Sequence, residues 1–293
     1  MHKAGFVNII GNPNVGKSTL MNALVGEKLS IITSKAQTTR HRIMGIVNGE
    51  DFQIVYSDTP GILKPAYKLQ ESMMNFVQGA VDDADVILYV TDTVEQSDRS
   101  ESIIEKINRS GIPTIVVINK IDLTTPEALE ALVEQWHERM PAARIVPVSA
   151  KENFNVGGLF DLILSLLPEG EPYYPKDTLT DKTLRFFASE IIREKIFLNY
   201  DKEVPYSVEI AIEEYREEPK IDRISATIYV TRDSQKGIII GHKGVALKKV
   251  STEARKSLEK FFGKSIYLEI FVKVDKDWRQ SSKAMKQYGY DLD

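Results

Sequence analysis

The chain has 293 residues, a length that favours two domains because single hydrophobic cores stop growing at about 250–300 residues. Hydrophobic residues make up 42% and charged residues 27%, which excludes a disordered, collagen-like or multi-span membrane protein. No apolar run reaches the ~18 residues of a membrane span, the first residues do not resemble a secretory signal, and no cysteine is present for disulfides or thiolate metal sites. We therefore expect a cytoplasmic protein.

Charge is unevenly distributed along the chain. The net charge is −4 overall, but it is −7 over residues 1–179 and +3 over residues 180–293. Residues 232–264 alone hold nine basic and three acidic side chains. This local excess suggests a surface for a polyanion, although a charge run by itself also suits a solvated helix face. Any nucleic-acid contact is therefore expected in the C-terminal part.

Apolar, β-rich runs alternate with helix-period segments through the first 167 residues. The six predicted strands are residues 6–10, 43–47, 52–56, 86–91, 114–118 and 144–148. The five predicted helices are residues 18–25, 69–81, 100–108, 127–139 and 156–167. This alternation predicts an α/β fold with a six-stranded, mostly parallel, doubly wound sheet. Because only four residues separate the second strand from the third, that pair should be an antiparallel hairpin at one edge.

Prolines and glycines without periodicity follow, which predicts an interdomain linker. We expect a first domain at residues 1–170, the linker at 171–183 and a second domain at 184–293. In the second domain the pattern predicts a helix, two strands, a short helix, a long helix and a strand, at residues 184–199, 206–215, 223–231, just before 241, 245–262 and 266–273. Residues 277–293 suggest a further helix with a frayed tail.

A P-loop pattern, G-x-x-x-x-G-K-[ST], follows the first predicted strand and opens the first helix. It consists of Gly11, Asn12, Pro13, Asn14, Val15, Gly16, Lys17 and Ser18, followed by Thr19. Glycines let backbone N–H groups surround phosphate oxygens, Lys17 reaches the β- and γ-phosphates, and the Ser18 hydroxyl suits Mg²⁺. A plain glycine turn would not explain a lysine at the start of the helix. The context therefore predicts a nucleotide-binding site.

Two further motifs choose the base. Asn119, Lys120 and Asp122 follow the fifth predicted strand, and Ser149, Ala150 and Lys151 follow the sixth. Ligands of open α/β sheets bind at these carboxyl ends. The Asp122 carboxylate can accept from both N1–H and the 2-amino group of guanine, and a backbone N–H near Ala150 can donate to its O6. The two motifs together predict GTP and GDP rather than ATP.

Asp58, Thr59, Pro60 and Gly61 follow the third predicted strand. Asp58 is expected to help hold Mg²⁺, and Gly61 to offer its N–H to the γ-phosphate. At this point the chain resembles the Era-like family of GTPases, over nearly its whole length. The resemblance implies that residues 35–42 are switch I, with Thr39 rather than Thr38 the sensor of Mg²⁺ and the γ-phosphate. Ser18, Thr39 and Asp58 are then the expected metal site.

Ile62 stands where Ras-like enzymes carry the glutamine that orients water, so hydrolysis depends on other groups. The catalytic candidates are Lys17, Asn14, Thr39 and Gly61. The side-chain oxygen of Asn14 could help hold K⁺ beside the β–γ bridge, which makes K⁺ a third expected cofactor, but a simple turn residue explains Asn14 equally well. Arg40 and Arg42 are weaker candidates, since arginines in loops are more often solvated.

The second domain contains a glycine loop that resembles the signature I-G-x-x-G of KH domains, and its predicted element order matches the prokaryotic-type KH fold. The expected RNA-binding residues are Lys236, Gly237, Ile240, Gly241, His242, Lys243, Gly244 and Lys248. Residues 238–240 and the strand residues 224–230 are expected to offer apolar surface to splayed bases. A plain glycine corner between helices is the alternative. Trp136 is expected in the core, whereas Trp278 suits either packing or RNA stacking.

The family resemblance implies a molecular switch that hydrolyses GTP, binds the 3′ end of 16S rRNA and assists assembly of the 30S ribosomal subunit, acting as a monomer. One alternative is a nucleotide-gated switch that binds a membrane or a protein, with incidental RNA affinity and a peripheral place on the inner face of the cell membrane. The basic residues 232–264, with a net charge of +6, suit anionic lipid, but no strongly amphipathic helix accompanies them. A tRNA-modification GTPase is a second alternative, which the lack of cysteine disfavours.

Overall fold

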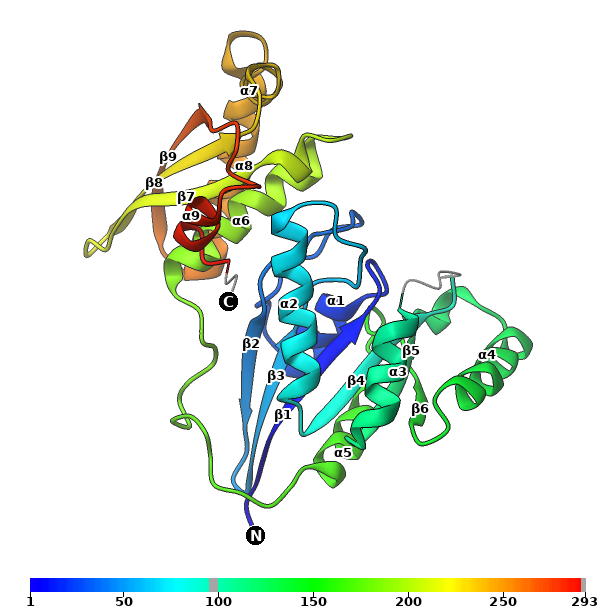
Figure 1. Ribbon diagram of the computed structural model, residues 1–293. Coiled ribbons are helices and arrows are strands. Elements are labelled where there is room, and N and C mark those ends of the chain that lie inside the picture. The colour runs from blue at the N-terminus through cyan, green and yellow to red at the C-terminus, as the bar shows by residue number, and fades with distance from the viewer. Residues whose placement is uncertain (95–99, 291–293) are drawn as a thin grey trace. The chain divides into compact units, whose positions relative to one another are not determined.

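The computed structural model describes residues 1–94 and 100–290 and divides into two compact units (Figure 1). Unit 1 consists of Met1–Ala66 and Gln70–Asp181, and unit 2 of Tyr67–Leu69 and Lys182–Asp293. The end of the predicted tail, residues 291–293, lies outside the described part of the chain. None of the helices within the described ranges has both the length and the apolar character needed to cross a bilayer.

Unit 1 is built on one six-stranded sheet with the order β2-β3-β1-β4-β5-β6. Its strands are β1 Lys3–Gly11, β2 Ile43–Asn48, β3 Phe52–Asp58, β4 Val86–Asp92, β5 Thr114–Asn119 and β6 Arg144–Pro147. All neighbours are parallel except β2, which pairs antiparallel with β3 at the edge. The predicted fold class and the hairpin are therefore confirmed.

Five α-helices lie in the described part of unit 1, and all except the last connect two strands. They are α1 Lys17–Val25, α2 Lys68–Asp82, α3 Glu101–Ser110, α4 Pro126–Arg139 and α5 Val156–Leu166. The mainly apolar strands β1, β4 and β5 are buried almost throughout, because helices cover both faces of a doubly wound sheet. This arrangement brings the carboxyl ends of β1, β3, β4, β5 and β6 to one edge of the sheet, where all the predicted nucleotide motifs lie.

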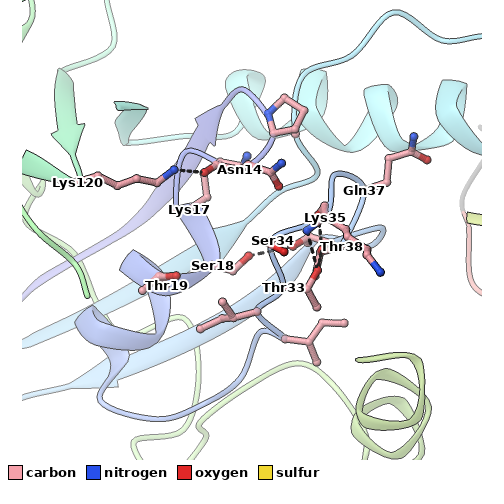
Figure 2. A pocket seen from close by; sticks show the side chains of 16 residues that line it. Asn14, Lys17, Ser18, Thr19, Thr33, Ser34, Lys35, Gln37, Thr38 and Lys120 are labelled. Atoms are coloured by element: carbon pink, nitrogen blue, oxygen red, sulfur yellow. Dashed lines mark hydrogen bonds between the residues drawn. The ribbon is translucent and has the colours of Figure 1, made fainter. Parts of the chain in front are cut away.

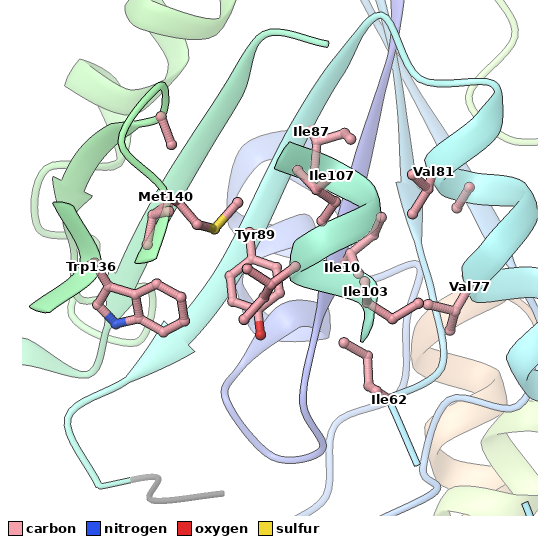
Figure 3. Close-up of a cluster of buried hydrophobic side chains, with 14 of the residues drawn as sticks. Ile10, Ile62, Val77, Val81, Ile87, Tyr89, Ile103, Ile107, Trp136 and Met140 are labelled. Carbon is pink, nitrogen blue, oxygen red and sulfur yellow. The ribbon is translucent and has the colours of Figure 1, made fainter. Parts of the chain in front are cut away.

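One core cluster packs α2, α3 and α4 against the sheet (Figure 3). Tyr89 of β4 and Trp136 of α4 lie with ring centroids 5.3 Å apart, and Trp136 is buried, which confirms the prediction that it packs in the core. Ile62 belongs to the same cluster and is also buried. The residue that replaces a water-orienting glutamine is therefore part of the core and cannot reach a nucleophile.

The segment predicted to be a linker, residues 171–183, is hydrogen-bonded to the edge of the sheet. The N–H of Ile46 donates to the carbonyl of Leu179 at 2.8 Å, and the hydroxyl of Thr180 donates to the carbonyl of Met44 at 2.6 Å. Up to Asp181 this segment therefore belongs to unit 1. It covers the free edge of β2. The backbone groups that an edge strand would otherwise leave unpaired are thereby partly satisfied.

Gln53 holds the start of this segment. Its side chain is fully buried, and its Nε2 donates to Asn48 Oδ1 at 2.7 Å and to the Tyr174 carbonyl at 2.8 Å. Its Oε1 accepts from the N–H groups of Tyr173, at 2.7 Å, and Tyr174, at 3.0 Å. A single amide thus satisfies three backbone groups of a segment more than 100 residues later in the chain.

Unit 2 contains a three-stranded sheet with the order β7-β8-β9. Its elements are α6 Leu184–Asn199, β7 Glu209–Arg216, β8 Ile221–Val230, α7 Asp233–Ile240, α8 Val245–Phe262, β9 Ser265–Val274 and α9 Ser282–Gln287. β7 and β8 are antiparallel, whereas β8 and β9 are parallel. The predicted αββααβ order is confirmed, with α9 following it.

Two expectations for unit 2 are settled by burial. Trp278 is fully buried, and its Nε1 donates to the Ser207 carbonyl at 3.1 Å, so it packs within the unit. The expectation that strand residues 224–230 offer apolar surface to bases is wrong: Ile224, Ile228 and Val230 are buried in the core. β8 is the central strand, and its apolar side chains face the helices instead.

We expect Gln53→Leu to lower the free energy of unfolding by about 1–3 kcal/mol, because it removes every hydrogen bond of a buried amide and leaves partly buried backbone groups of Tyr173 and Tyr174 without this partner. Urea unfolding followed by circular dichroism measures the change. Gln78→Leu, on the exposed side of α2, is the matched control and should stay within about 0.5 kcal/mol of the unmodified protein. Equal losses for both variants would contradict this role of Gln53.

Candidate functional site

The P-loop connects β1 to α1 by a tight turn. Asn14 has φ +65° and Gly16 φ +95°, both in the left-handed region. A Cβ at Gly16 would lie 2.2 Å from Nδ2 of Asn119, so only glycine fits where the P-loop approaches the base motif. Val15 is buried, whereas Asn14 is exposed at the tip of the loop.

A cavity of about 350 Å³ lies at this edge of unit 1 (Figure 2). Three predicted segments line it: the P-loop with Thr19, the switch I region, and Gly61. Lys120 of the base motif completes the lining, which also includes Ile31 and Ile32. Segments that are far apart in the sequence thus share one cavity.

Lys17 lies within the P-loop with its ammonium group held by backbone carbonyls. Its Nζ donates to the Gly11 carbonyl at 3.0 Å and to the Asn12 carbonyl at 2.8 Å, and its side chain is buried. An ammonium group has three donors that reorient freely, so the same group can turn its N–H bonds to phosphate oxygens.

Three oxygen-bearing side chains meet at the floor of the site, as expected for a metal site. Ser18 Oγ donates to Asp58 Oδ2 at 2.7 Å, and Thr39 Oγ1 donates to the same atom at 3.3 Å. The two hydroxyl oxygens lie 3.0 Å apart. Among the residues described, the buried Asp58 Oδ1 has no hydrogen-bond partner.

This donor set fits Mg²⁺, which prefers oxygen ligands and is usually held by one or two carboxylates together with substrate phosphates. Ser18 and Thr39 supply hydroxyl oxygens, and the unpartnered oxygen of Asp58 supplies negative charge beside them. Thr38 lies elsewhere: its hydroxyl contacts Thr33 Oγ1 and the Lys35 carbonyl, each at 2.6 Å. The geometry therefore favours Thr39 over Thr38 as the metal-facing threonine.

The Asp58 carboxyl is fully buried, and burial raises its pKa above the ordinary range. The hydrogen bond from Ser18, the charge of Lys17 and the hydrogen bond from Thr39 oppose this rise. A carboxylate in this position is desolvated, so a cation beside it relieves a cost that the fold imposes.

The segment after β3 packs directly on the P-loop. Thr59 Oγ1 donates to the Ile9 carbonyl at 2.7 Å, and the N–H of Ile62 donates to the Gly11 carbonyl at 3.1 Å. A Cβ at Gly61 would lie 2.7 Å from Cα of Pro13, so glycine is required for this approach. Gly61 is thereby held at the wall of the cavity.

The base motifs also come together. Asn119 Nδ2 donates to the Val15 carbonyl at 2.9 Å, and its Oδ1 accepts from the N–H of Ala150 at 3.0 Å. Ser149 Oγ donates to Asp122 Oδ1 at 2.6 Å and orients the carboxylate proposed for guanine. Lys151, in contrast, is exposed and pairs with Glu152 at 3.0 Å.

The two arginines of switch I are not solvated, which corrects the expectation from the sequence. Arg40 is fully buried. Arg42 forms two hydrogen bonds with Asp83, at 2.6 and 3.0 Å, and further ones with Ser57 and Asn8. Arg42 therefore ties the start of β2 to the end of α2 and is not available as an internal finger.

Sequence reasoning missed Asp92, which pairs with Lys120 Nζ at 2.6 Å. Asp92 ends β4 and lies opposite Asn119 in the strand register. The rule that ligands bind at the carboxyl ends of parallel strands could have found it.

In unit 2, the predicted glycine loop joins α7 to α8. Gly241, Lys243 and Gly244 all have positive φ values, +71°, +49° and +77°. A Cβ at Gly241 would lie 2.6 Å from Cβ of Ala246, so the loop closes tightly on α8. His242 and Lys243 point into the open, since both are exposed.

The surroundings of this loop combine apolar and basic surface. Ile238 is 48% and Val245 67% exposed, on the two sides of the loop, whereas Ile240 packs partly against the core. Gly237 and Lys248 are exposed and Lys236 is half-buried. Exposed apolar side chains beside a cationic loop suit a nucleotide strand, which has both base faces and phosphates.

The apparent Mg²⁺ affinity of the unit 1 site should fall as pH is lowered, starting at a higher pH than for an ordinary aspartate, because burial raises the pKa of Asp58. A proton and Mg²⁺ compete for the Asp58 carboxylate, so below its raised pKa the affinity should drop about tenfold per pH unit. Mg²⁺ titrations of GTP hydrolysis at several pH values measure this. Asp58→Asn, which removes the titrating group, should abolish the pH dependence, and an equally steep dependence in that variant would contradict the assignment.

Comparison with known proteins finds relatives of both units. A family model described as 50S ribosome-binding GTPase matches residues 6–120, and a KH domain model matches residues 203–279. GTPase Era of Clostridium kluyveri is 44% identical over 99% of this chain and 100% of its own length. GTPase Era of Staphylococcus haemolyticus is also 44% identical, over 99% of this chain and 97% of its own.

Two solved structures match the whole chain. Era in complex with MgGDPNP and nucleotides 1506–1542 of 16S ribosomal RNA is 42% identical, with a TM-score of 0.95 and full coverage of both chains. A variant of Era from Aquifex aeolicus bound to GDP·AlF4⁻ is 42% identical, with a TM-score of 0.95, over 99% of this chain and 100% of that one. With this identity over nearly its entire length, and with a P-loop domain followed by a KH domain, the chain belongs to the Era family of GTPases.

Proposed function

We propose that this protein is a molecular switch that hydrolyses GTP, binds small-subunit rRNA near its 3′ end and assists assembly of the 30S ribosomal subunit. One observation carries the proposal: the likeness over the full chain to Era bound to MgGDPNP and 16S rRNA nucleotides. The exposed GXXG loop of unit 2 and the oxygen cluster of unit 1 supply the chemistry that such a switch requires.

In the nucleotide site, the backbone of the P-loop and the Lys17 ammonium group bind the phosphates, and Ser18, Thr39 and Asp58 hold Mg²⁺. When bound, Mg²⁺ neutralises the charge that develops on the phosphate oxygens. Asp122 accepts from the guanine edge, held by Ser149. Thr39 and Gly61 contact the γ-phosphate, which GDP lacks, so the two nucleotides stabilise different conformations of the switch segments.

Position 62 of this protein is an isoleucine that is buried in the core, so no side chain at this position can orient the attacking water. We assign charge stabilisation to a monovalent cation, K⁺, with Asn14 as its protein ligand. Asn14 is exposed at the tip of the P-loop, where the oxygen of its side-chain amide can face the phosphates. A cation there acts on charge that grows in the transition state, so it raises turnover more than affinity.

In unit 2, we propose that Gly241, His242, Lys243 and Gly244 bind the RNA backbone, with Lys236, Gly237, Ile240 and Lys248 around them. We keep 1–170 and 184–293 as the proposed domains, with 171–183 as the segment between them, most of which packs on unit 1. A cytoplasmic location, a monomeric state and association with the 30S subunit belong to the same proposal. Peripheral attachment to a membrane belongs to the alternative function, the nucleotide-gated membrane-binding switch.

The base assignment predicts that Asp122→Asn shifts preference from GTP toward XTP by about 10²-fold or more. An amide places a donor where the 2-amino group of guanine needs an acceptor, whereas the 2-oxo group of xanthine accepts from it. Competition between GTP and XTP for the same preparation measures the shift. Unchanged preference for GTP would remove Asp122 from the base site.

The RNA assignment predicts that replacing His242 and Lys243 by Asp lowers affinity for single-stranded 16S 3′-end sequence by at least about tenfold and flattens its salt dependence. Two carboxylates would then face the phosphates, while fewer counterions would be released. RNA titrations at several KCl concentrations, beside a GTP-binding assay, measure both effects. GTP affinity should not change.

Thr252→Asp combined with Lys256→Asp is a control with the same change in formal charge. Both residues are exposed on α8, about two and three turns beyond the loop. Equal loss of RNA affinity in this control would indicate a diffuse charge effect. Full RNA affinity in the loop variant would contradict the assignment and favour the protein-binding alternative.

A further inference from the structure

Lys120 connects the P-loop to the end of β4, and recognition of the base does not account for these contacts. Its Nζ donates to the backbone carbonyl of Asn14 at 2.6 Å, as Figure 2 shows, and to Asp92 Oδ2 at 2.6 Å. Three segments therefore meet at one ammonium group: the P-loop, the end of β4 and the end of β5. The Lys120 ammonium group thus bridges the Asp92 carboxylate and the backbone of Asn14, the residue that we propose as a K⁺ ligand.

Both residues of the hydrogen bond between Lys120 and the Asn14 carbonyl have strained backbones. Asn14 has φ +65° and Lys120 φ +61°, in a region that residues other than glycine rarely adopt. Such conformations persist only where the surroundings hold them. The hydrogen bond from Lys120 to the Asn14 carbonyl is a restraint of this kind on the exposed tip of the P-loop.

Asp92 in turn holds Lys120. It is 5% exposed, and both of its carboxylate oxygens are engaged: Oδ2 by Lys120 and Oδ1 by the N–H of Val94 at 3.0 Å. The hydroxyl of Thr93 also donates to the Lys120 carbonyl at 3.3 Å. The end of β4 thus fixes both the main chain and the side chain of Lys120. A buried carboxylate anchored at both oxygens is a rigid support for a lysine that is otherwise 31% exposed.

We infer that Asp92 is a positioning residue for GTP hydrolysis, which acts through Lys120 on the main chain of Asn14 and thereby on the Asn14 side chain. The inference rests on the proposed role of Asn14 as a K⁺ ligand. Without Asp92 the ammonium group turns to solvent and the Asn14 carbonyl loses its donor. Lys17 and Ser18 keep their own contacts, so nucleotide binding persists while the tip of the loop gains freedom.

The alternative is that Asp92 only supports the base motif. In that case its loss would weaken binding of GDP and GTP and relax the choice of base, because Lys120 lies between Asn119 and Asp122. The two explanations separate by which quantity changes: turnover and cation response in the first, nucleotide affinity in the second. Small displacements of a catalytic group can cost about 10²-fold in rate, so the effect should be measurable.

The experiment compares the unmodified protein with Asp92→Asn, which keeps the shape of the side chain and removes its charge. The readouts are kcat and KM for GTP in KCl and in NaCl at equal ionic strength, and the affinity for a fluorescent GDP. A third readout, independent of turnover, is formation of the complex between fluorescent GDP and aluminium fluoride in each salt. Asp85→Asn is the matched control. Asp85 directly precedes β4, at the end far from Asp92, and its carboxylate likewise accepts from a backbone N–H, that of Phe6.

We expect Asp92→Asn to lower kcat in KCl at least about tenfold, to bring the ratio of rates in KCl and NaCl close to one, and to abolish the KCl preference of the aluminium fluoride complex. GDP affinity should change less than about threefold, and Asp85→Asn should behave as the unmodified protein. Adding Asp92→Asn to Asn14→Ala should cause no further loss, because both changes act on one element.

Three results would overturn the inference. A K⁺-stimulated unmodified protein whose Asp92→Asn variant keeps its turnover and salt ratio removes the role of Asp92 alone. An Asp92→Asn variant that loses GDP affinity, or that does not fold well enough to bind GDP, assigns Asp92 to support of the base motif. Equal rates in KCl and NaCl for the unmodified protein reject the proposed cation role of Asn14, and the inference with it.

Discussion

The nucleotide site of this protein depends on one side-chain amide, that of Asn119. Its Nδ2 donates to the carbonyl of Val15 in the P-loop, and its Oδ1 accepts from the N–H of Ala150 in the loop after β6. Gly16 must be glycine because the same amide occupies the space of a Cβ. Loops from three strands are thereby held in one relative position, and the phosphate-binding and base-binding parts act as one site because their separation is fixed.

A buried charge lies at the centre of this arrangement. The Asp58 carboxyl is fully buried, its pKa is raised by desolvation, and one of its oxygens has no partner among the described residues. An isolated carboxylate in such a place is costly unless a cation accompanies it. The fold therefore places the charge of the proposed magnesium site in advance, and Ser18 and Thr39 place their hydroxyl oxygens beside it. Switch I is connected to the floor of the site through Thr39.

Unit 2, like the P-loop, uses residues with positive φ to form an exposed loop. Its loop uses positive φ at Gly241, Lys243 and Gly244 to turn sharply between two helices, which exposes backbone and cationic side chains together. The apolar residues of β8 are used for the core, so the surface available to a nucleotide strand is supplied by the loop and by exposed Ile238 and Val245. The same sheet thus stabilises the unit and leaves binding to its helical side.

The sequence by itself determined the elements and the motifs, because periodicity and short-range turn chemistry are local. It predicted the six strands with their antiparallel edge, the P-loop, the base motifs and the GXXG loop. Contacts between distant segments were decided by the tertiary structure alone. Thr39 and Thr38 are adjacent in the chain; the family resemblance favoured Thr39, and packing brings it to Asp58 while Thr38 contacts Thr33. In the same way, Trp278 finds its partner Ser207 about 70 residues away, the glycine- and proline-rich segment is bound by Gln53, and Asp92 meets Lys120 because β4 and β5 are neighbours in the sheet. No local pattern encodes these pairs, since each depends on where a side chain lies once the core has formed.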